Sequence, residues 1–302
     1  MRLSVDKLPK VPKRYRVQRQ VLREGEWLGF ESKTEAQSEH AERCRIISRL
    51  LQARDPVAHS WSSGQIKRLI RRIEQAESLA SSVYMRKRRR RVAGHLVRLM
   101  EKDGGPITAF TLLPDSWVFA AGSLGAVDPT QLLSALRQAL RRKGAPQASG
   151  WFFGFIDGEY DPNSGTFRLH VHGLASGELV DVVRQLKKAR NLQPVGRTRS
   201  KTAVAKPVLL QSIVRTPAKV ATYVVKGFWG ERPAFESCEG KLKRPRGRRR
   251  ISSIQQFAEH LMWLDRWRLS DLTLLMGMSV GRRGFRVRRK CTLMMGDVAP
   301  SP

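Results

Sequence analysis

Two histidines one residue apart offer the sharpest chemical signal in the sequence. They lie in the run Leu169-His170-Val171-His172-Gly173, which has the composition of a strand. Because side chains alternate along a strand, His170 and His172 project from the same face, about 7 Å apart along it. Two imidazoles on one face form half of a metal site. The alternative is a pair of hydrogen-bonded strand histidines without a metal.

A turn sequence predicts how the histidine strand is paired. Residues 151–160 and 166–174 both have the apolar and aromatic composition of strands. The segment between them reads Asp-Pro-Asn-Ser-Gly, and these residue types favour a tight turn. We therefore expect the two strands to form an antiparallel hairpin.

The hairpin brings a carboxylate to the histidines if its register is the expected one. With Asp161 opposite Thr166, Asp157 lies opposite His170 and on the same face as both histidines. A register shift of one residue would turn it to the other face. Glu159 is the alternate ligand. Two histidines and a carboxylate with open positions suit a divalent ion that also holds phosphate oxygens, so we expect Mg²⁺ or Mn²⁺.

A tyrosine and two lysines share one face of a short helix predicted over residues 216–227, where Thr-Pro marks the start and Gly the end. Lys219, Tyr223 and Lys226 are four and three residues apart, so their side chains lie together. Two cations and a metal-bound phosphate would favour the phenolate. Tyr223 is therefore a candidate nucleophile toward phosphorus. The alternative is an ordinary tyrosine on a half-exposed amphipathic helix.

The elements around these motifs indicate an α+β fold. Two further strands are expected at residues 107–113 and 208–214. Helices are expected at residues 35–52, 64–79, 128–144, 178–189 and 252–274, the last as one helix or a helix pair. From residue 106 to 230 the order is strand, helix, strand, strand, helix, strand, helix. This order is typical of an antiparallel-rich sheet covered by helices.

The composition points to a folded protein with a polyanionic partner. The 302 residues include 57 Lys and Arg against 26 Asp and Glu, a net charge of +31, and 41% are hydrophobic. Such an excess of positive charge favours nucleic acid as partner. No stretch approaches the roughly 20 apolar residues of a membrane span, and no secretory signal is evident, so we expect a cytoplasmic protein without a membrane partner. Three scattered cysteines support neither a disulfide framework nor a zinc site.

Blocks of arginine flank the central segment. We expect a basic, mainly helical N-terminal region over residues 1–105, a catalytic domain over 106–230, and a basic linker with a helical C-terminal region over 231–302. Arginine matches phosphate oxygens with a planar fork, so the blocks are predicted to grip DNA. Phe228 and Trp229 are predicted to stack on unpaired bases. The predicted DNA-binding residues are Lys219, Phe228, Trp229, Arg86, Arg88, Arg89, Arg90, Arg248, Arg249, Arg250, Arg282 and Arg283.

Three short runs, in this order, resemble the motifs of the HUH endonuclease superfamily, in its single-tyrosine rolling-circle replication initiator branch. They are Phe110-Thr-Leu112, His170-Val-His172 and Tyr223-Val-Val-Lys226. The resemblance spans residues 106–230, about 40% of the chain. The acidic run from Asp157 to Tyr160 also resembles the strand that precedes the histidine pair in plasmid initiators. Histidines before the tyrosine is the order found in replication initiators.

The resemblance implies a ferredoxin-like sheet and a DNA nicking reaction. The ion would polarise the scissile phosphate, and Tyr223 would form a 5′-phosphotyrosyl link and release a 3′-hydroxyl that primes synthesis. Lys226 would orient the phosphate. The implied role is to initiate rolling-circle replication of a plasmid or phage-like element. Its partners would be single-stranded or extruded origin DNA, duplex contacted through its backbone, and the host replication helicase and polymerase.

Two departures and three alternatives remain open. Some plasmid initiators carry a Glu four residues before the tyrosine, which activates water to terminate the replication cycle. In this sequence that position is Lys219. No second tyrosine follows at residues 227–230, so the two-tyrosine mechanism of strand transfer lacks its residue. A second monomer or another acid such as Glu231 would have to take its place. A transposase with the same chemistry, a noncatalytic basic nucleic-acid-binding protein and an RNA-processing protein are the alternatives.

Overall fold

The computed structural model describes residues 4–17, 20–21, 27–28, 30–52, 61–188, 208–227, 229–233, 235–236, 242–243 and 249–288. Within these residues the predicted α+β class is confirmed, with seven α-helices and a mostly antiparallel sheet of seven strands. The helices are α1 (Lys33–Gln52), α2 (Ser63–Glu74), α3 (Ser82–Asp103), α4 (Pro129–Arg142), α5 (Leu179–Gln185), α6 (Pro217–Val224) and α7 (Ile254–Arg266).

Five strands form the main sheet in the order β11-β5-β6-β3-β7, and each pairs antiparallel with its neighbours. Two short strands extend it: β4 pairs with β6, and β8 pairs with β5 in parallel. The bounds are β3 (Ile107–Leu112), β4 (Val118–Ala120), β5 (Phe152–Asp161), β6 (Thr166–Ser176), β7 (Val208–Ile213), β8 (Gly230–Glu231) and β11 (Thr273–Met276).

Three separate two-stranded pairs complete the described strands. They are β1 (Gln20–Val21) with β2 (Trp27–Leu28), β9 (Phe235–Glu236) with β10 (Leu242–Lys243), and β12 (Met278–Gly281) with β13 (Gly284–Val287). The β12-β13 hairpin follows β11 directly, so the last described elements of the chain all lie in extended structure.

The β5-β6 hairpin is the longest pairing of the sheet, and it confirms the register expected from the turn. Asp161 pairs with Thr166, and the pairing continues without a shift to the far ends of both strands. At the turn the Asp161 carboxylate accepts a hydrogen bond from the backbone N–H of Asn163, and Gly165 has a φ of 61°. These are the turn conformations for which Asx residues and glycine are suited.

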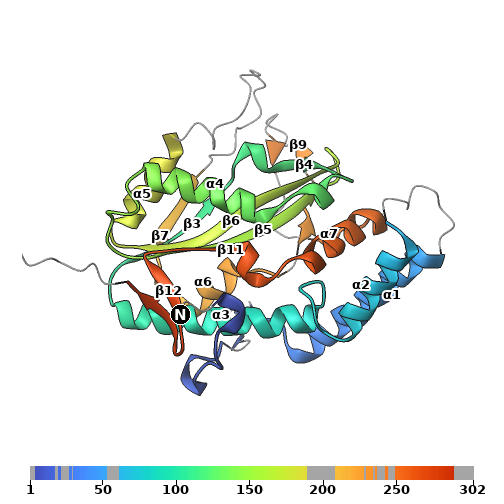
Figure 1. The fold of residues 1–302 in the computed structure, drawn as a ribbon, viewed down its shortest axis with the longest axis horizontal. Coiled ribbons are helices and arrows are strands. Elements are labelled where there is room, and N and C mark those ends of the chain that lie inside the picture. Colours follow the sequence, from blue (N-terminus) through green and yellow to red (C-terminus); the bar gives the residue numbers. More distant parts are fainter. Residues whose placement is uncertain are drawn as a thin grey trace, which may run out of the picture.

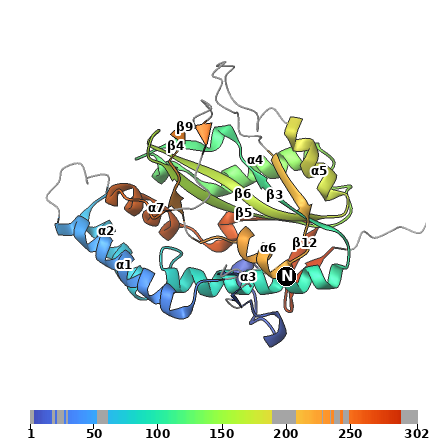
Figure 2. The same ribbon diagram turned by 180° about the vertical axis from the view of Figure 1, so that it is seen from behind.

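Helices cover both faces of the sheet. Figure 1 shows α4 and α5 on one side and α3 and α6 on the other, and the same arrangement is visible from behind in Figure 2. The apolar core runs through both layers and includes residues of α1, α2 and α3 as well as the sheet. Phe110 and Phe152 stack at its centre with ring centroids 4.9 Å apart. Burial of each such ring stabilises the fold by roughly 1.5 to 3 kcal/mol.

The N-terminal helices pack on both later parts of the chain. Helix α3 contacts α6 of the segment that resembles a nicking domain, and α1 contacts α7 of the C-terminal region. Ser81 caps the start of α3 by accepting a hydrogen bond from the Tyr84 N–H, and Gly104 ends the helix with a φ of 66°. The arginine block at residues 86–91 therefore lies in the middle of a long helix, with α6 beside it.

The C-terminal region differs from the expectation in one respect. The sequence predicts a helix or helix pair as far as residue 274, but α7 ends at Arg266, and residues 273–276 form β11. Thr273 of β11 pairs with Phe155 of β5, so the main sheet extends beyond residues 106–230. The apolar spacing of this segment suits a buried strand as well as a helix, and sequence alone does not separate the two for a short run.

Other helices are also shorter than expected. Helix α2 ends at Glu74 instead of residue 79, and α5 is followed by one turn of 3₁₀-helix at Leu186–Lys188. Helix α6 ends at Val224 instead of residue 227, so Lys226 lies two residues beyond the helix that carries Lys219 and Tyr223. Among the described residues, no helix combines the length and the apolar character needed to cross a membrane.

A histidine of α7 is enclosed in the core. His260 is fully buried and stacks on Trp229 with ring centroids 5.0 Å apart. Neither of its ring nitrogens has a hydrogen-bond partner among the described residues. Burial lowers the pKa of His260 well below its ordinary value; the charge of Arg43 adds to this effect, whereas that of Asp157 opposes it.

The burial of His260 predicts a loss of stability in mild acid. The folded state holds the ring neutral while the unfolded state binds a proton below pH 6.5, so this contribution to stability is present above that pH and is lost as the pH falls. We expect His260→Phe to reduce the dependence of the unfolding free energy on pH, by about 1 kcal/mol per pH unit below the ordinary histidine pKa. Urea unfolding at a series of pH values measures it.

Phe257→Leu is the matched control, because it alters the same part of the core without a titratable group. This variant should lower the unfolding free energy by a similar amount at every pH. Equal pH dependence in the wild type and His260→Phe would contradict the assignment.

Candidate metal centre and nucleophile

Pairing of β5 with β6 brings three ligand side chains to one place. Asp157 lies directly opposite His170, and His172 lies two residues farther along the same face of β6. The side chains are almost fully enclosed: Asp157 is 0% exposed, and each histidine is 3% exposed. The sheet therefore delivers the predicted set of two imidazoles and one carboxylate without help from a loop.

The distances in this set suit a bound ion. The Nε2 atoms of His170 and His172 both lie 3.3 Å from Asp157 Oδ2, and they lie 3.1 Å from each other. Adjacent ligands of an octahedral ion with bonds of about 2.0–2.1 Å lie about 3 Å apart. One ligand atom from each residue lies within 4.8 Å of the others, so this buried group could hold a metal ion.

A threonine on the neighbouring strand orients one of the imidazoles. Thr111 of β3 pairs with His172, and its hydroxyl oxygen lies 2.9 Å from His172 Nδ1. When Nδ1 carries the proton and donates to this oxygen, the lone pair of Nε2 faces Asp157 and His170. A partner of this kind, on the ring nitrogen away from the metal, is common for histidine ligands.

The protonation state of His172 also suits a ligand. Burial lowers the pKa of His172 to about 4, even though Asp157 beside it acts in the opposite direction. The ring is therefore neutral near neutral pH, as metal binding requires.

Tyr223 lies against the ligand set. It comes from α6, which begins with Pro217 at its first position. The ring of Tyr223 contacts the ring of His172 with centroids 4.7 Å apart, and the tyrosine is 39% exposed. The ammonium of Lys226 lies over the tyrosine ring, 3.7 Å from its centroid. A phenol, a cation and three potential metal ligands are thus gathered at one place on the sheet.

Comparison of the chain with protein-family models, with curated proteins and with solved structures finds no match. The interpretation of this site therefore depends on its own geometry and on the sequence motifs.

The structure distinguishes the two carboxylates that the sequence offers as third metal ligand. Glu159 is also buried, but its carboxylate lies 3.1 Å from the guanidinium of Arg232. Asp157 is the carboxylate within reach of both histidines.

The predicted DNA-stacking and lysine residues lie in different environments. Lys219 is exposed on α6. Trp229 is 2% exposed and packs between Trp263 and His260, so its ring faces are covered in this structure. Phe228 lies outside the described residues.

The arginines of α3 make contacts within the chain. Arg86 donates to the Glu31 carbonyl, and Arg88 donates to the Asp6 carbonyl. Arg89 is buried, and Arg90 is half-buried. A DNA contact by these residues stays a prediction.

The C-terminal arginines are more varied. Arg282 and Arg283 are exposed at the turn of the β12-β13 hairpin, and Arg249 is exposed as well. Arg250 forms ion pairs with Glu39 and Glu42 of α1. Arg248 lies outside the described residues.

Two contributors to the site have roles that the sequence does not indicate. Thr111 lies within the first of the three motifs, but nothing in the local sequence fixes the register of β3 against β6. Arg89 belongs to a predicted phosphate-binding block, whereas its burial depends on packing between α3 and α6. Neither role has a signal in a single sequence.

The geometry predicts which carboxylate supports metal binding. We expect Mn²⁺ to raise the melting temperature of the wild type, because an ion that binds the folded state stabilises it. Asp157→Asn should weaken Mn²⁺ binding at least about tenfold, since one anionic ligand is lost. Calorimetric titration with Mn²⁺ measures the affinity.

Glu159→Gln is the control, because it removes a buried carboxylate two residues away that contacts Arg232. This variant should bind Mn²⁺ with the affinity of the wild type, even if it is less stable. A loss of affinity in Glu159→Gln with none in Asp157→Asn would reverse the assignment.

Proposed function

We propose that this protein is a metal-dependent DNA nicking and strand-transfer enzyme that initiates rolling-circle replication of a plasmid or phage-like element. One observation carries the proposal: the ring of Tyr223 lies against His172 of the buried Asp157–His170–His172 group. The order of the histidine and tyrosine motifs, which resembles that of single-tyrosine initiators, supports the same conclusion.

Asp157, His170 and His172 would hold the ion. The three-residue set leaves coordination positions for phosphate oxygens, and a carboxylate among the ligands favours Mg²⁺ or Mn²⁺. When bound, such an ion supplies Lewis-acid polarisation of a phosphoryl oxygen.

Tyr223 is the proposed nucleophile. Its oxygen attacks the scissile phosphorus, a bond between tyrosine oxygen and phosphorus forms, and the bond from phosphorus to the 3′ oxygen breaks. The tyrosine proton is lost to solvent, and the departing 3′ oxygen takes up a proton to become a hydroxyl. The exposure of Tyr223 leaves the ring within reach of a DNA strand, whereas the ligands below it are enclosed.

Lys226 supports this step from above the ring. Its ammonium lies over the tyrosine ring, where it would attract a phosphate oxygen and stabilise the negative charge that develops in the reaction. The phosphotyrosyl link preserves the energy of the broken bond, so attack by a 3′-hydroxyl on the link rejoins DNA without a cofactor that supplies energy.

The charge of the chain supports DNA as the substrate. A net charge of +31 favours a polyanion, and the exposed Arg249, Arg282 and Arg283 are available for phosphate contacts. We place the reaction in the cytoplasm, where single-stranded or extruded origin DNA and the host helicase and polymerase are present. The released 3′-hydroxyl would serve that polymerase as primer.

The nucleophile can be tested with DNA of randomised sequence, so the origin need not be identified first. We expect the wild type with Mn²⁺ to form a covalent adduct with a pool of single-stranded random oligonucleotides. The adduct should retain a 3′ label and lose a 5′ label, because Tyr223 binds the 5′ phosphate of the downstream fragment. Denaturing electrophoresis detects it, and sequencing of the captured strands identifies the site.

Tyr223→Phe should form no adduct, while its affinity for the same pool stays within about twofold of the wild type. Tyr84→Phe is the control, because it removes a tyrosine hydroxyl from α3, where the ring contacts the guanidinium of Arg88. An adduct of equal yield in Tyr223→Phe would refute the nucleophile. Retention of the 5′ label instead would refute the polarity of the link.

The two lysines near Tyr223, Lys219 on α6 and Lys226 just beyond its end, are expected to behave differently. Lys226→Met should lower the cleavage rate at saturating DNA about 10- to 100-fold, because its cation lies over the reacting phenol. Lys219→Met removes the same charge from an exposed position of α6, so it should weaken DNA binding and leave the saturated rate unchanged. Single-turnover cleavage of a captured oligonucleotide measures both, and equal rate defects in the two variants would contradict the role of Lys226.

A further inference from the structure

Arg89 is buried although it lies within a run of six basic residues at positions 86–91. Its Nε–H donates to the carbonyl of Val225, and a terminal guanidinium nitrogen lies 3.2 Å from the Glu31 carboxylate. The guanidinium also lies over the ring of Phe30, 4.7 Å from its centroid. These contacts join α3, the segment before α1 and the end of α6, and they are typical of a structural arginine.

The Val225 carbonyl, which accepts the hydrogen bond from Arg89, lies close in the chain to Tyr223. Val225 directly follows the last residue of α6 and lies between Tyr223 and Lys226 in the sequence. Carbonyls at the end of a helix lack an intrahelical partner, and a cation there is favourable. Arg89 therefore satisfies and fixes the end of the helix that carries the proposed nucleophile, at the residue just before Lys226.

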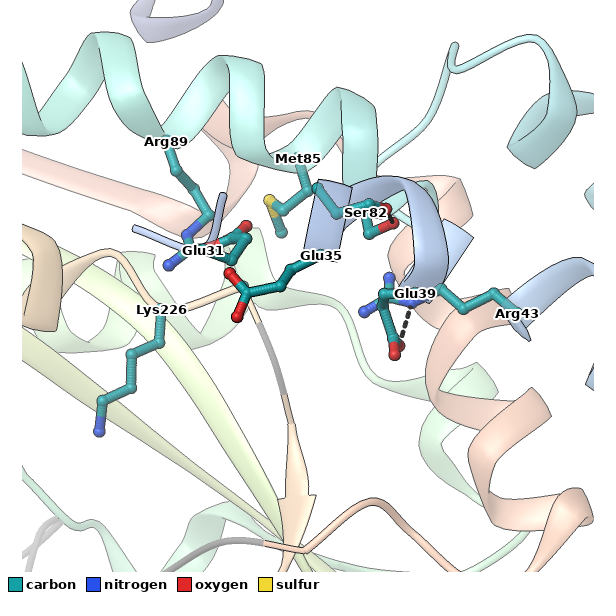
Figure 3. A pocket seen from close by; sticks show the side chains of 10 residues that line it. Glu31, Glu35, Glu39, Arg43, Ser82, Met85, Arg89 and Lys226 are labelled. Atoms are coloured by element: carbon teal, nitrogen blue, oxygen red, sulfur yellow. Dashed lines mark hydrogen bonds and ion pairs between the residues drawn. The ribbon is translucent and has the colours of Figure 1, made fainter. Parts of the chain in front are cut away.

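The chain approaches Arg89 closely just beyond this carbonyl. A Cβ atom added to Gly227 would lie 2.6 Å from Arg89 Cδ and 2.7 Å from Met85 Cγ. Any larger residue at this position therefore requires the Arg89 and Met85 side chains, or the chain after α6, to move. Figure 3 shows Arg89 and Met85 projecting from α3 into a pocket of about 420 Å³ that Lys226 also lines.

We propose that Arg89 is a positioning residue for the reaction at Tyr223. Its bond to the Val225 carbonyl holds the end of α6 so that Tyr223 lies against His172 and Lys226 lies over the tyrosine ring, and Glu31 compensates its buried charge. This proposal rests on the proposed function. It gives Arg89 a role within the chain in place of the predicted contact with DNA.

Substitution of Arg89 should affect the rate and not the binding of DNA. We expect Arg89→Met to lower the single-turnover cleavage rate at saturating oligonucleotide about 10- to 100-fold, since small displacements of a reacting group have effects of this size. The dissociation constant for the same oligonucleotide should stay within about twofold. Arg89→Lys keeps one charged donor and should recover a large part of the lost rate.

Arg98→Met is the matched control. It removes the same charge from another position of α3, where the side chain donates to the Arg283 carbonyl and not to α6. Its saturated rate should equal that of the wild type. Gly227→Ala tests the same contact from the other side, and it should lower the rate while Arg89 is retained.

Two results would overturn the proposal. One is a wild-type rate in Arg89→Met or, if that variant does not fold, in Gly227→Ala. The other is a defect in Arg89→Met that consists only of weaker DNA binding, which would make Arg89 a DNA contact.

A measurement without DNA separates this proposal from the proposed function. By hydrogen exchange, amides of α6 should exchange faster in Arg89→Met than in the wild type, while amides of α2 are unchanged. If the wild type forms no adduct, the proposed function fails. In that case faster exchange in α6 still supports a holding role for Arg89, and unchanged exchange overturns it.

Discussion

The register between β5 and β6 is the constraint on which the rest of the site depends. Because side chains alternate on a strand, a slip of one residue would turn Asp157 away from His170 while the number of backbone hydrogen bonds hardly changed. The turn prevents the slip: it places Asp161 opposite Thr166, and the pairing continues from there without a shift. The turn at one end of the hairpin thus fixes the geometry of a buried polar ligand set farther along the two strands.

The proposed nucleophile, Tyr223, is held by a different kind of contact. Helix α6 has only eight residues, and a helix of this length is marginal in water without tertiary packing. Ala221 and Val224 bury its inner face, and α3 packs along it and bonds its last carbonyl. The candidate metal ligands are therefore placed by the sheet, whereas the position of Tyr223 depends on a helix from the N-terminal region. In the proposed reaction, the DNA strand meets both at their junction.

The parts that could be predicted from the sequence have local causes. Turn residues fix the hairpin register, and Asp128 accepts a hydrogen bond from the Thr130 N–H at the start of α4, as its position before Pro129 indicates. The features that could not be predicted from the sequence depend on contacts between residues far apart in the chain. Strand β11 pairs with β5, and Arg89 is buried by Glu31 and by α6, so neither follows from spacing. A run of arginines has the same pattern whether its members face solvent or a carbonyl.

The position of β11 has a consequence for biosynthesis. Strand β5 is an inner strand of the finished sheet, between β6 and β11. Strand β11 consists of residues 273–276, which come late in the chain. During synthesis the β5-β6 hairpin is complete long before these residues leave the ribosome, so β5 has an open edge rich in phenylalanine for most of that time. Open, apolar edges pair with other chains and promote aggregation. The β5-β6 hairpin of the nascent chain is thus exposed to aggregation until residues 273–276 are made and pair with it.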